Sequence, residues 1–387
     1  MGAVSEVYLY SNTGVQLACL PKRLTRLEWS RVVNDQGSFA ITLSDRLKPV
    51  DTSLFQLNGR IAIYRKPSPI YPAKLEMMGF IRGWDFETDG RGVTRYTWYG
   101  PDQNCLLADR ICFPKHPYTE GAWQTSMRRY IDTMMRELTE DNFGAGSSNE
   151  SARDVVTANG AGLTLAVESS ATATSCNVDN LLFYEYGGKN LLRALQELHE
   201  ISKSYTFTPG QQVPIFFDLC TDTDTTFTFR TFPNRRGMNH RSDSGQAVHI
   251  GTRYGNLSVP RWQHDRTHEV NAGLGLLYAG SYSASSWSLD SARIGEAPLN
   301  RREAGTSTGE DTGGIASQLI NEGKPKPRFS GKIQDTSTCR YGLHWGLGDE
   351  LTIDYLEKQY NCRVTGISAT VYSGRETLEP TMEVLDT

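Results

Sequence analysis

The amino-acid sequence predicts a mainly β chain with an α+β insertion, in which a small β-barrel domain lies at each end. Three observations predict this class. Residues 4–110 contain several runs in which apolar and polar side chains alternate, as they do in half-buried strands. Similar runs return at 347–371. Between these two ends, apolar residues recur at helical spacing over 119–140 and again from Gly187 onwards.

The N-terminal third predicts a series of strands joined by turns. Residues 39–43 and 57–64 alternate between apolar and polar side chains, and two further strands are expected within 79–100. The turn Asp89–Gly92 divides this last pair. The proline-rich segment 66–72 cannot donate a full ladder of hydrogen bonds, so it predicts a loop or an edge.

The middle of the chain predicts a small α+β unit. The helix over 119–140 is expected to pack through Trp123, Met127, Tyr130, Ile131, Met134 and Leu138. One short strand is predicted at Leu163–Val167, and a second helix begins near Gly187 with Leu191, Leu195 and Leu198 on its buried face. Strands at 215–219 and 227–232 enclose a hairpin at Asp222–Asp224.

The C-terminal part predicts a loop followed by closing strands. Residues 281–314 are rich in Ser, Gly and Thr, which favours a long mobile loop, and a short helix is expected near 315–321. Alternation changes parity at Gly366, which predicts a β-bulge, and Ser373–Gly374 predicts the last turn. The predicted domains are a barrel at 1–112, a helical insert at 113–180, an α+β domain at 181–262 and a second barrel at 263–387.

Composition excludes several classes of function. The 387 residues carry a net charge of −4 and a pI near 6.0, so no general electrostatic attraction to nucleic acid or acidic membranes is expected. No run approaches the roughly 18 apolar residues of a membrane-spanning helix, and no signal peptide is expected. The seven cysteines are widely spaced without a CxxC motif, which favours buried free thiols made in a reducing cytoplasm.

No pattern of residues predicts catalysis, a cofactor or a metal. His264 and His268 would share a helical face as zinc ligands do, but the residues that follow favour a strand or loop. Asp222 and Asp224 offer oxygens for calcium, but the glycine and distal glutamate of an EF-hand are missing. Nucleophile, P-loop and Cys/His motifs are also lacking. We therefore predict no enzyme, and no catalytic, cofactor-binding or metal-binding residue.

Clusters of arginine are the candidate contacts with other proteins. The run 235–241 has the highest density of basic residues, and arginine is enriched in subunit interfaces. The candidates are Arg235, Arg236, Arg241, Arg301 and Arg302. The aromatic residues Trp84, Trp98 and Tyr99 could stack on a sugar, but we expect them in the core of the first barrel.

The order of these segments resembles the tail hub proteins, also called baseplate hub or tail-associated proteins, of long-tailed bacteriophages of the siphophage type. The segments that carry the resemblance are Trp29 with 34–39, 79–83, 99–111, 190–195, 254–257 and 341–351. Residues 141–180 and 281–310 lie outside it, and Tyr99–Asp102 departs from it because a serine-rich step is expected there.

The resemblance implies a structural virion protein, assembled in the host cytoplasm, that forms a homotrimer at the tip of the tail. Each subunit would carry two barrels like that of the tube protein, so that three subunits match a hexameric tube. The implied partners are a distal tail or tube protein ring above, a central fibre or spike below, and phage DNA passing through the lumen. Two alternatives stay open: a carbohydrate-binding tail-tip adhesin, and a hub that cleaves peptidoglycan.

Overall fold

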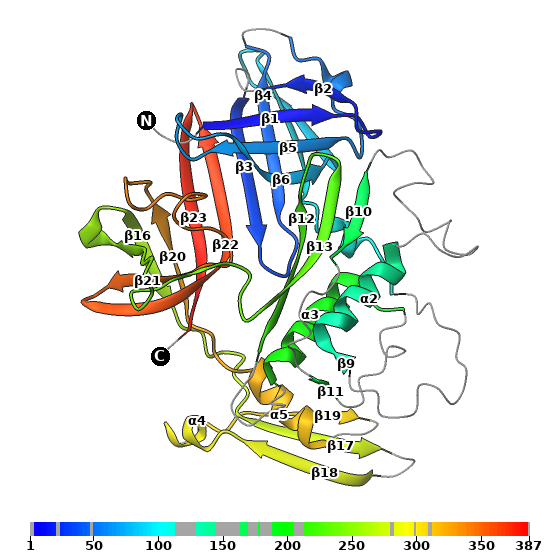
Figure 1. Ribbon diagram of the computed structural model, residues 1–387, viewed down its shortest axis with the longest axis vertical. Helices are drawn as coiled ribbons and strands as arrows, with labels where there is room; N and C mark the ends of the chain where they lie inside the picture. Colours follow the sequence, from blue (N-terminus) through cyan, green and yellow to red (C-terminus); the bar gives the residue numbers. More distant parts are fainter. Residues whose placement is uncertain are drawn as a thin grey trace.

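The computed structural model describes most of the chain, with gaps in the middle. The described residues are 4–20, 24–46, 49–112, 129–143, 163–168, 177–178, 188–204, 213–278, 282–297, 299–308 and 312–385. Within them the protein is mainly β, with several antiparallel sheets and few helices, as the sequence predicts (Figure 1). No helix among these residues is long and apolar enough to cross a membrane.

The largest sheet joins the two ends of the chain. Its path within the described residues is β16-β20-β23-β22-β3-β4-β8-β7, and β21 pairs with β22 beside this path. The strands of the path are β3 (Leu24–Val32), β4 (Ser38–Ser44), β7 (Gly83–Thr88), β8 (Thr94–Pro101), β16 (Leu257–Gln263), β20 (Arg328–Ile333), β22 (Lys358–Tyr372) and β23 (Arg375–Val384). Strand β21 spans Glu350–Tyr355 and also pairs with the short strands β14 (Asn239–His240) and β15 (His249–Gly251).

The N-terminal and C-terminal halves of this sheet meet where β3 pairs with β22. Gly366 lies opposite Val32 and Tyr372 lies opposite Arg26, so the two strands run antiparallel over seven residue pairs. A register shift lies between Val364 and Gly366 in the pairing of β22 with β23. This irregularity confirms the predicted bulge, which lets one long strand turn its side chains between two neighbouring parts of the core.

A second sheet covers the long one. It follows the order β2-β1-β5-β6. Its strands are β1 (Val4–Tyr10), β2 (Gln16–Cys19), β5 (Arg60–Lys66) and β6 (Lys74–Phe80). Val7, Ile61 and Met77 from this sheet share a single buried apolar core with residues of β3, β4, β22 and β23. Both ends of the chain therefore contribute to one core.

The other face of the second sheet packs on an α+β unit. Tyr10, Ala62 and Met78 join a second apolar cluster with this unit. The unit contains β9 (Arg129–Tyr130), β10 (Thr164–Val167), β11 (Asn177–Val178), β12 (Ile215–Thr221), β13 (Thr226–Pro233), α1 (Cys105–Ala108), α2 (Ile131–Phe143) and α3 (Leu191–Ser204). Figure 1 shows α2 and α3 side by side, beyond β10 and β13.

The predictions for this unit are largely confirmed. Leu191, Leu195 and Leu198 are fully buried on α3, and the strand over 163–167 and the 222–224 hairpin are present. In the other helix, Ile131, Met134 and Leu138 are buried as predicted, but residues 129–130 form a strand and the helix begins at Ile131. Trp123 and Met127 lie outside the described residues.

The prediction of a long loop over 281–314 is wrong. Strand β18 (Tyr282–Leu289) and strand β19 (Glu303–Thr308) flank β17 (Ala272–Tyr278), and α4 (Ser291–Gly295) lies between them. Helix α5 (Thr312–Glu322) covers one face of this sheet, as the lower part of Figure 1 shows. At Gly273 and Gly275, an added Cβ would lie 2.0 Å from a backbone oxygen of α5. Gly273 and Gly275 of β17 therefore allow close packing of α5 on this sheet.

Candidate functional site

The long sheet has one apolar face and one polar face. Along β3, for example, Leu27 and Trp29 are buried while Glu28 and Ser30 remain accessible. The same alternation holds in the neighbouring strands, so one side of the sheet presents small or charged side chains. Those on the four central strands include Glu28, Ser30, Ala40, Thr42, Ser368 and Thr370. This face is suited to contact with water or a polar partner.

The middle of this polar face is hollowed into an open groove. Its walls come from β3, β4, β8 and β22 and include Glu28, Ser30, Ala40, Tyr99 and Thr370. Hydroxyl groups, small side chains and one carboxylate line the groove, together with one half-exposed aromatic ring, Tyr99. Glu28 pairs with Arg26 at 2.6 Å, and the hydroxyls of Ser30 and Ser38 lie 3.0 Å apart.

The predicted aromatic core is confirmed at one position and wrong at two. Trp98 is 1% exposed and stacks on Phe55 with ring centroids 3.6 Å apart. Trp84 is 50% exposed and Tyr99 is 47% exposed. They lie on opposite faces, because Trp84 pairs with Trp98 while Tyr99 pairs with Gly83 on the polar side. Trp84 is uncovered because the edge strand β7 has no neighbour on its outer side among the described residues, and Tyr99 on β8 is uncovered because it faces the open groove.

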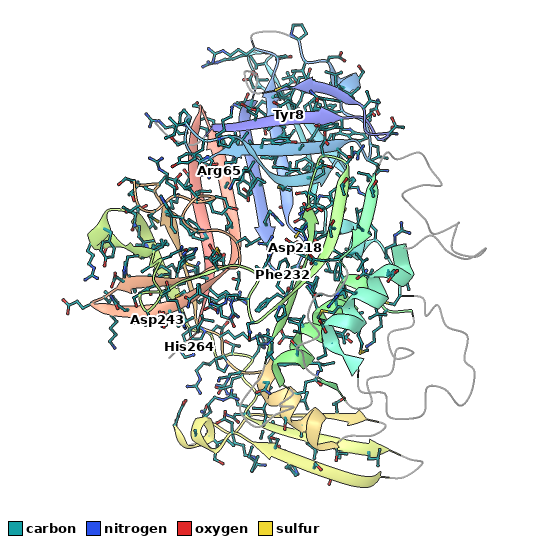
Figure 2. The ribbon with its side chains drawn as sticks, viewed as in Figure 1. Tyr8, Arg65, Asp218, Phe232, Asp243 and His264 are labelled. Atoms are coloured by element: carbon teal, nitrogen blue, oxygen red, sulfur yellow. The ribbon has the colours of Figure 1, made fainter. Side chains whose placement is uncertain are left out.

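A buried carboxylate ties three parts of the molecule together. Asp218 on β12 accepts hydrogen bonds from Arg31 on β3 (2.6 Å) and from Arg236, whose Nε lies 3.0 Å away. Arg236 also donates to the backbone oxygen of Leu347 at 2.8 Å. Burial alone would raise the pKa of Asp218, but the guanidinium groups of Arg236 and Arg31 outweigh it and hold the pKa below its usual value. Figure 2 places Asp218 near the centre of the molecule.

Asp102 lies beside this cluster in a different electrostatic state. Burial raises the pKa of Asp102 to about 7, although Arg31 opposes the shift, and the charge of Asp218 adds to it. One carboxylate oxygen, Oδ2, has no hydrogen-bond partner among the described residues. Asp102 also accepts a hydrogen bond from the backbone N–H of Asn104 at 3.0 Å, which fixes the start of α1. It therefore has a structural role.

A second buried cluster joins β5 to the C-terminal strands. Arg65 is 1% exposed and donates through Nη2 to Glu376 on β23 at 2.6 Å. It also donates to the backbone oxygen of Tyr341 at 2.6 Å and lies 3.2 Å from Asp335. Burial raises the pKa of Glu376 even though Arg65 opposes this. Like the Asp218 cluster, it holds segments that are distant in sequence.

Three of the predicted contact arginines lie in one region and pair within the chain. Arg235 lies 3.3 Å from Glu350, and Arg241 contacts both Asp243 (3.2 Å) and Glu350 (3.8 Å). Arg236 is mostly buried on Asp218. Contact of Arg235 and Arg241 with another protein stays a prediction. The guanidinium of Arg236, however, already binds the buried carboxylate of Asp218.

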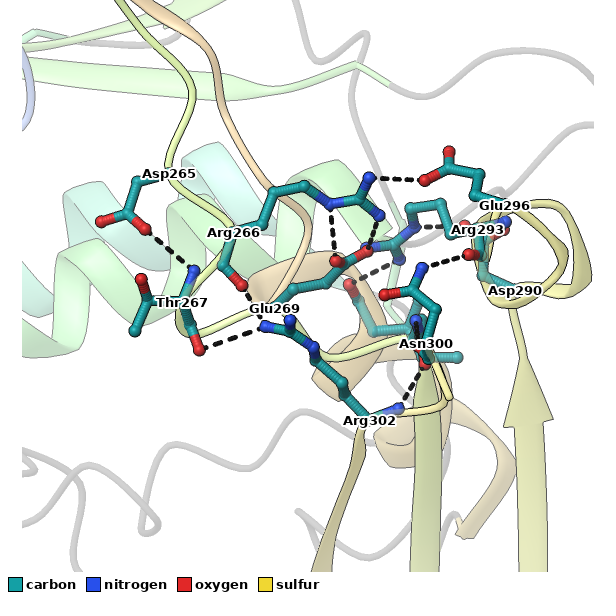
Figure 3. Close-up of polar contacts among 11 residues, drawn as sticks. Asp265, Arg266, Thr267, Glu269, Asp290, Arg293, Glu296, Asn300 and Arg302 are labelled. Atoms are coloured by element: carbon teal, nitrogen blue, oxygen red, sulfur yellow. Dashed lines mark hydrogen bonds and ion pairs between the residues drawn. The ribbon is translucent and has the colours of Figure 1, made fainter. Parts of the chain in front are cut away.

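The other two predicted arginines flank a polar network beside β17. Glu269, whose side chain is fully buried, accepts hydrogen bonds from Arg266 at 2.8 Å and lies 3.3 Å from Arg293 (Figure 3). Hydrogen bonding to Arg266 lowers the pKa of Glu269. Arg302 donates to backbone oxygens of the 266–267 turn, and Arg301 pairs with Glu303 at the surface while lying over Trp287.

Neither the histidines considered as metal ligands nor the cysteines form a metal site among the described residues. Residues 264–268 form a loop and turn, not a helix, and the described residues contain no cluster of three or more His, Cys, Asp or Glu side chains able to hold a metal. Four cysteines are buried as predicted: Cys105, Cys112, Cys339 and Cys362. Cys19 is exposed, Cys220 is half-buried, and Cys176 lies outside the described residues.

The residues that carry the clusters were not found by sequence reasoning. Arg65 and Glu376 are 311 positions apart, and Arg31 and Asp218 are 187 apart. No local spacing links such pairs. The available signal was a charged residue among apolar ones, as at Arg31 between Trp29 and Val33 and at Asp218 within the predicted strand 215–219.

The fold has known counterparts, although no protein-family model and no curated protein matches the sequence. A tail protein from Neisseria meningitidis MC58 superposes with a TM-score of 0.56 at 10% identity, covering 100% of this chain and 97% of that one. A 43 kDa tail protein of prophage MuSo2 from Shewanella oneidensis gives 0.54 at 11% identity, covering 97% and 98%. A chain of a PdpA–VgrG complex gives 0.50 at 9% identity, with 100% of this chain and 65% of that chain covered.

The first two similarities extend over essentially the whole length of both aligned chains. The matched region of this chain therefore spans the long sheet, the α+β unit and the β17–β19 module. At this level of identity the likeness concerns the fold. This chain has the fold of these two tail proteins, one of which comes from a prophage.

Proposed function

We propose that the chain is a structural component of a phage tail that forms a homotrimeric hub at the tail tip. The observation that carries the proposal is the long sheet, which unites strands from both ends of the chain and has one polar face. Three such sheets around an axis would enclose a water-filled lumen, with the polar faces inward. The whole-length similarity to tail proteins supports this assignment.

In the proposed hub, each subunit supplies two barrel-like domains, one built mainly from the N-terminal strands and one from the C-terminal strands. Three subunits then offer six such domains to a hexameric ring of a tube protein above and a threefold fibre or spike below. The domain boundaries at 112, 180 and 262 are those predicted from the sequence. The role is mechanical, and the proposed subunit needs no catalytic residue, cofactor or metal.

The charges of the polar face fit passage of DNA without tight binding. Arg26 and Glu28 form a pair on β3, and Lys332 lies 3.3 Å from Glu379 on the neighbouring strands. Opposite charges are thus interspersed, and hydroxyl groups lie between them. Since tight DNA binding requires many unneutralised cations, this surface would let DNA slide during ejection.

Copy number tests the proposal. Quantitative mass spectrometry of purified phage particles should give about three copies of this chain per particle, measured against the major tube protein. Six or more copies would assign the chain to a tube or adaptor ring. Its absence from particles would overturn the proposal.

A carbohydrate-binding role at the tail tip is the second candidate. The specific observation in its favour is the pair of half-exposed rings, Trp84 and Phe86, on one face of the edge strand β7. Aromatic rings exposed in this way can stack on sugars. Binding of the purified chain to a glycan array, lost in Trp84→Ala, would favour this role, and an array without signal would remove it.

A further inference from the structure

The long sheet ends in two edge strands that run in opposite directions. Within the described residues, β7 and β16 each have a neighbour on one side only along this path. Every adjacent pair on the path is antiparallel, so strand direction alternates from β16 to β7. Because the path has an even number of strands, a second copy rotated about an axis along the strands would place its β16 antiparallel to β7.

The polar sides of these two edges carry opposite charges. Asp85 and Glu87 are exposed on β7 and lie on the polar face, because they pair with Thr97 and Arg95 of β8. Arg261 is exposed on the same face of β16, and Arg328 lies on the next strand opposite Gln263. No ion pair within 4.0 Å joins Asp85 or Arg261 to another described residue. One edge is therefore acidic and the other basic.

The apolar sides of the edges match as well. Trp84 and Phe86 of β7 lie on the core side and remain half exposed, at 50% and 46%. On β16, Trp262 lies on the core side opposite Phe329, and its ring is 4.6 Å from that of Tyr360. Each edge thus brings aromatic rings to one side and charge to the other. Aromatic pairs and pairs of opposite charge across neighbouring strands stabilise a sheet.

Strand β16 limits how far the pairing can extend. Its pairing with β20 is irregular between Ser258 and Arg261, Val259 has a positive φ of 50°, and Pro260 has no backbone N–H. These features protect an edge against indiscriminate pairing. The regular part, Arg261–Gln263, is the part that carries the charge and the tryptophan.

We propose that β7 of one copy pairs with the Arg261–Gln263 part of β16 in the next copy, with Asp85 near Arg261 and Trp84 near Trp262. The contact is heterologous, so repeating it about a threefold axis closes the ring and leaves neither edge free. This inference rests on the proposed function and specifies the surface through which the hub subunits join.

Zero-length cross-linking tests the seam directly. Asp85 and Arg261 lie at opposite ends of the strand path within one chain, so a bond between them reports contact between copies. In Arg261→Lys, a water-soluble carbodiimide should join the introduced amine to Asp85 or Glu87 by an amide bond, detected as a linked peptide in a covalent oligomer. The pair Lys332–Glu379, 3.3 Å apart within one chain, is the internal control for the reaction.

Charge reversal provides the second test, by sedimentation or mass photometry of the full chain. Asp85→Arg and Arg261→Glu should each lower the association constant of every β7–β16 contact by roughly tenfold. The double variant should recover most of the loss. Glu28→Arg, a charge reversal in the middle of the same face that also breaks the pair with Arg26, is the control and should leave assembly unchanged.

The outcomes separate this inference from the function on which it rests. A trimer with no cross-link in Arg261→Lys and no response to either edge reversal overturns the seam and leaves the hub intact. A wild-type chain that stays monomeric at all concentrations, and is not present at three copies in particles, overturns both.

Discussion

Two carboxylates, Asp218 and Glu269, are each held by two arginines, but they connect very different parts of the molecule. Asp218 joins β3, β12 and the segment after β13, and every partner is largely buried. Glu269 pairs with Arg266, three residues away, and with Arg293, 24 residues away, and Arg266 keeps a side-chain exposure of 34%. The first cluster fixes the arrangement of units, and the second fixes a local turn.

The difference lies in what remains when the carboxylate is removed. At Asp218, two cations would stay in the interior, where water cannot replace the lost charge. At Glu269, Arg266 can turn into solvent and also has Glu296 at 2.5 Å as a second partner. Equal numbers of ion pairs therefore do not imply equal contributions to stability.

The largest effect is expected for Asp218→Asn, which keeps the shape and removes the charge. We expect a loss of about 3–5 kcal/mol in the free energy of unfolding, because Arg31 and Arg236 are left buried without a counter-charge. Urea unfolding followed by tryptophan fluorescence measures it. The control is Asp243→Asn, whose side chain is 61% exposed and should change stability by less than about 0.5 kcal/mol. Equal effects of the two variants would contradict the comparison.

A pH-dependent effect is expected next, at Asp102. Its pKa in the folded chain is about 7, above that of an unfolded chain at about 4, so the folded state holds the extra proton. Stability from this group is therefore complete below about pH 4 and is lost as the pH rises toward 7. Asp102→Asn should gain on the order of 1–3 kcal/mol relative to wild type between about pH 5 and pH 8. If the unfolding free energies of the two proteins changed with pH in the same way, the raised pKa of Asp102 would be refuted.

Glu269→Gln should have a smaller effect, of about 1–2 kcal/mol, because one of its arginines can reach water. The carboxylate pKa is lowered in the folded chain, so its stabilisation is present above the unfolded pKa and is lost as the pH falls through the folded one. Hydrogen exchange should rise mainly in β17 and α4. Increased exchange in β3 or β22 would show that this cluster also acts at long range.

The smallest effect is expected for Glu303→Gln. It breaks a surface pair with Arg301 in which both side chains are about half exposed. The change in unfolding free energy should stay below about 0.5 kcal/mol and should vanish in about 1 M salt. A larger loss would mean that the cation–π contact of Arg301 with Trp287 depends on this pair.

Local patterns predicted much of the fold, and long-range contacts could not be predicted. The helix with Leu191, Leu195 and Leu198, and the bulge at Gly366, follow from periodicity in short windows. The segment 281–314 was misassigned because its serines and threonines were interpreted as loop formers, although Ser285, Trp287 and Leu289 share the exposed side of a strand. The ion clusters join residues hundreds of positions apart, so no local spacing identifies them.

The pairing of β3 with β22 has a consequence for how the chain is made. Strand β3 leaves the ribosome long before its partner, Lys358–Tyr372, has been translated. Until then, the backbone of Leu24–Val32 has an unpaired edge, and part of the core formed by Leu27 and Trp29 is uncovered. Folding of this sheet therefore cannot finish before β22 has been translated, and a chain truncated before residue 358 should aggregate instead of folding.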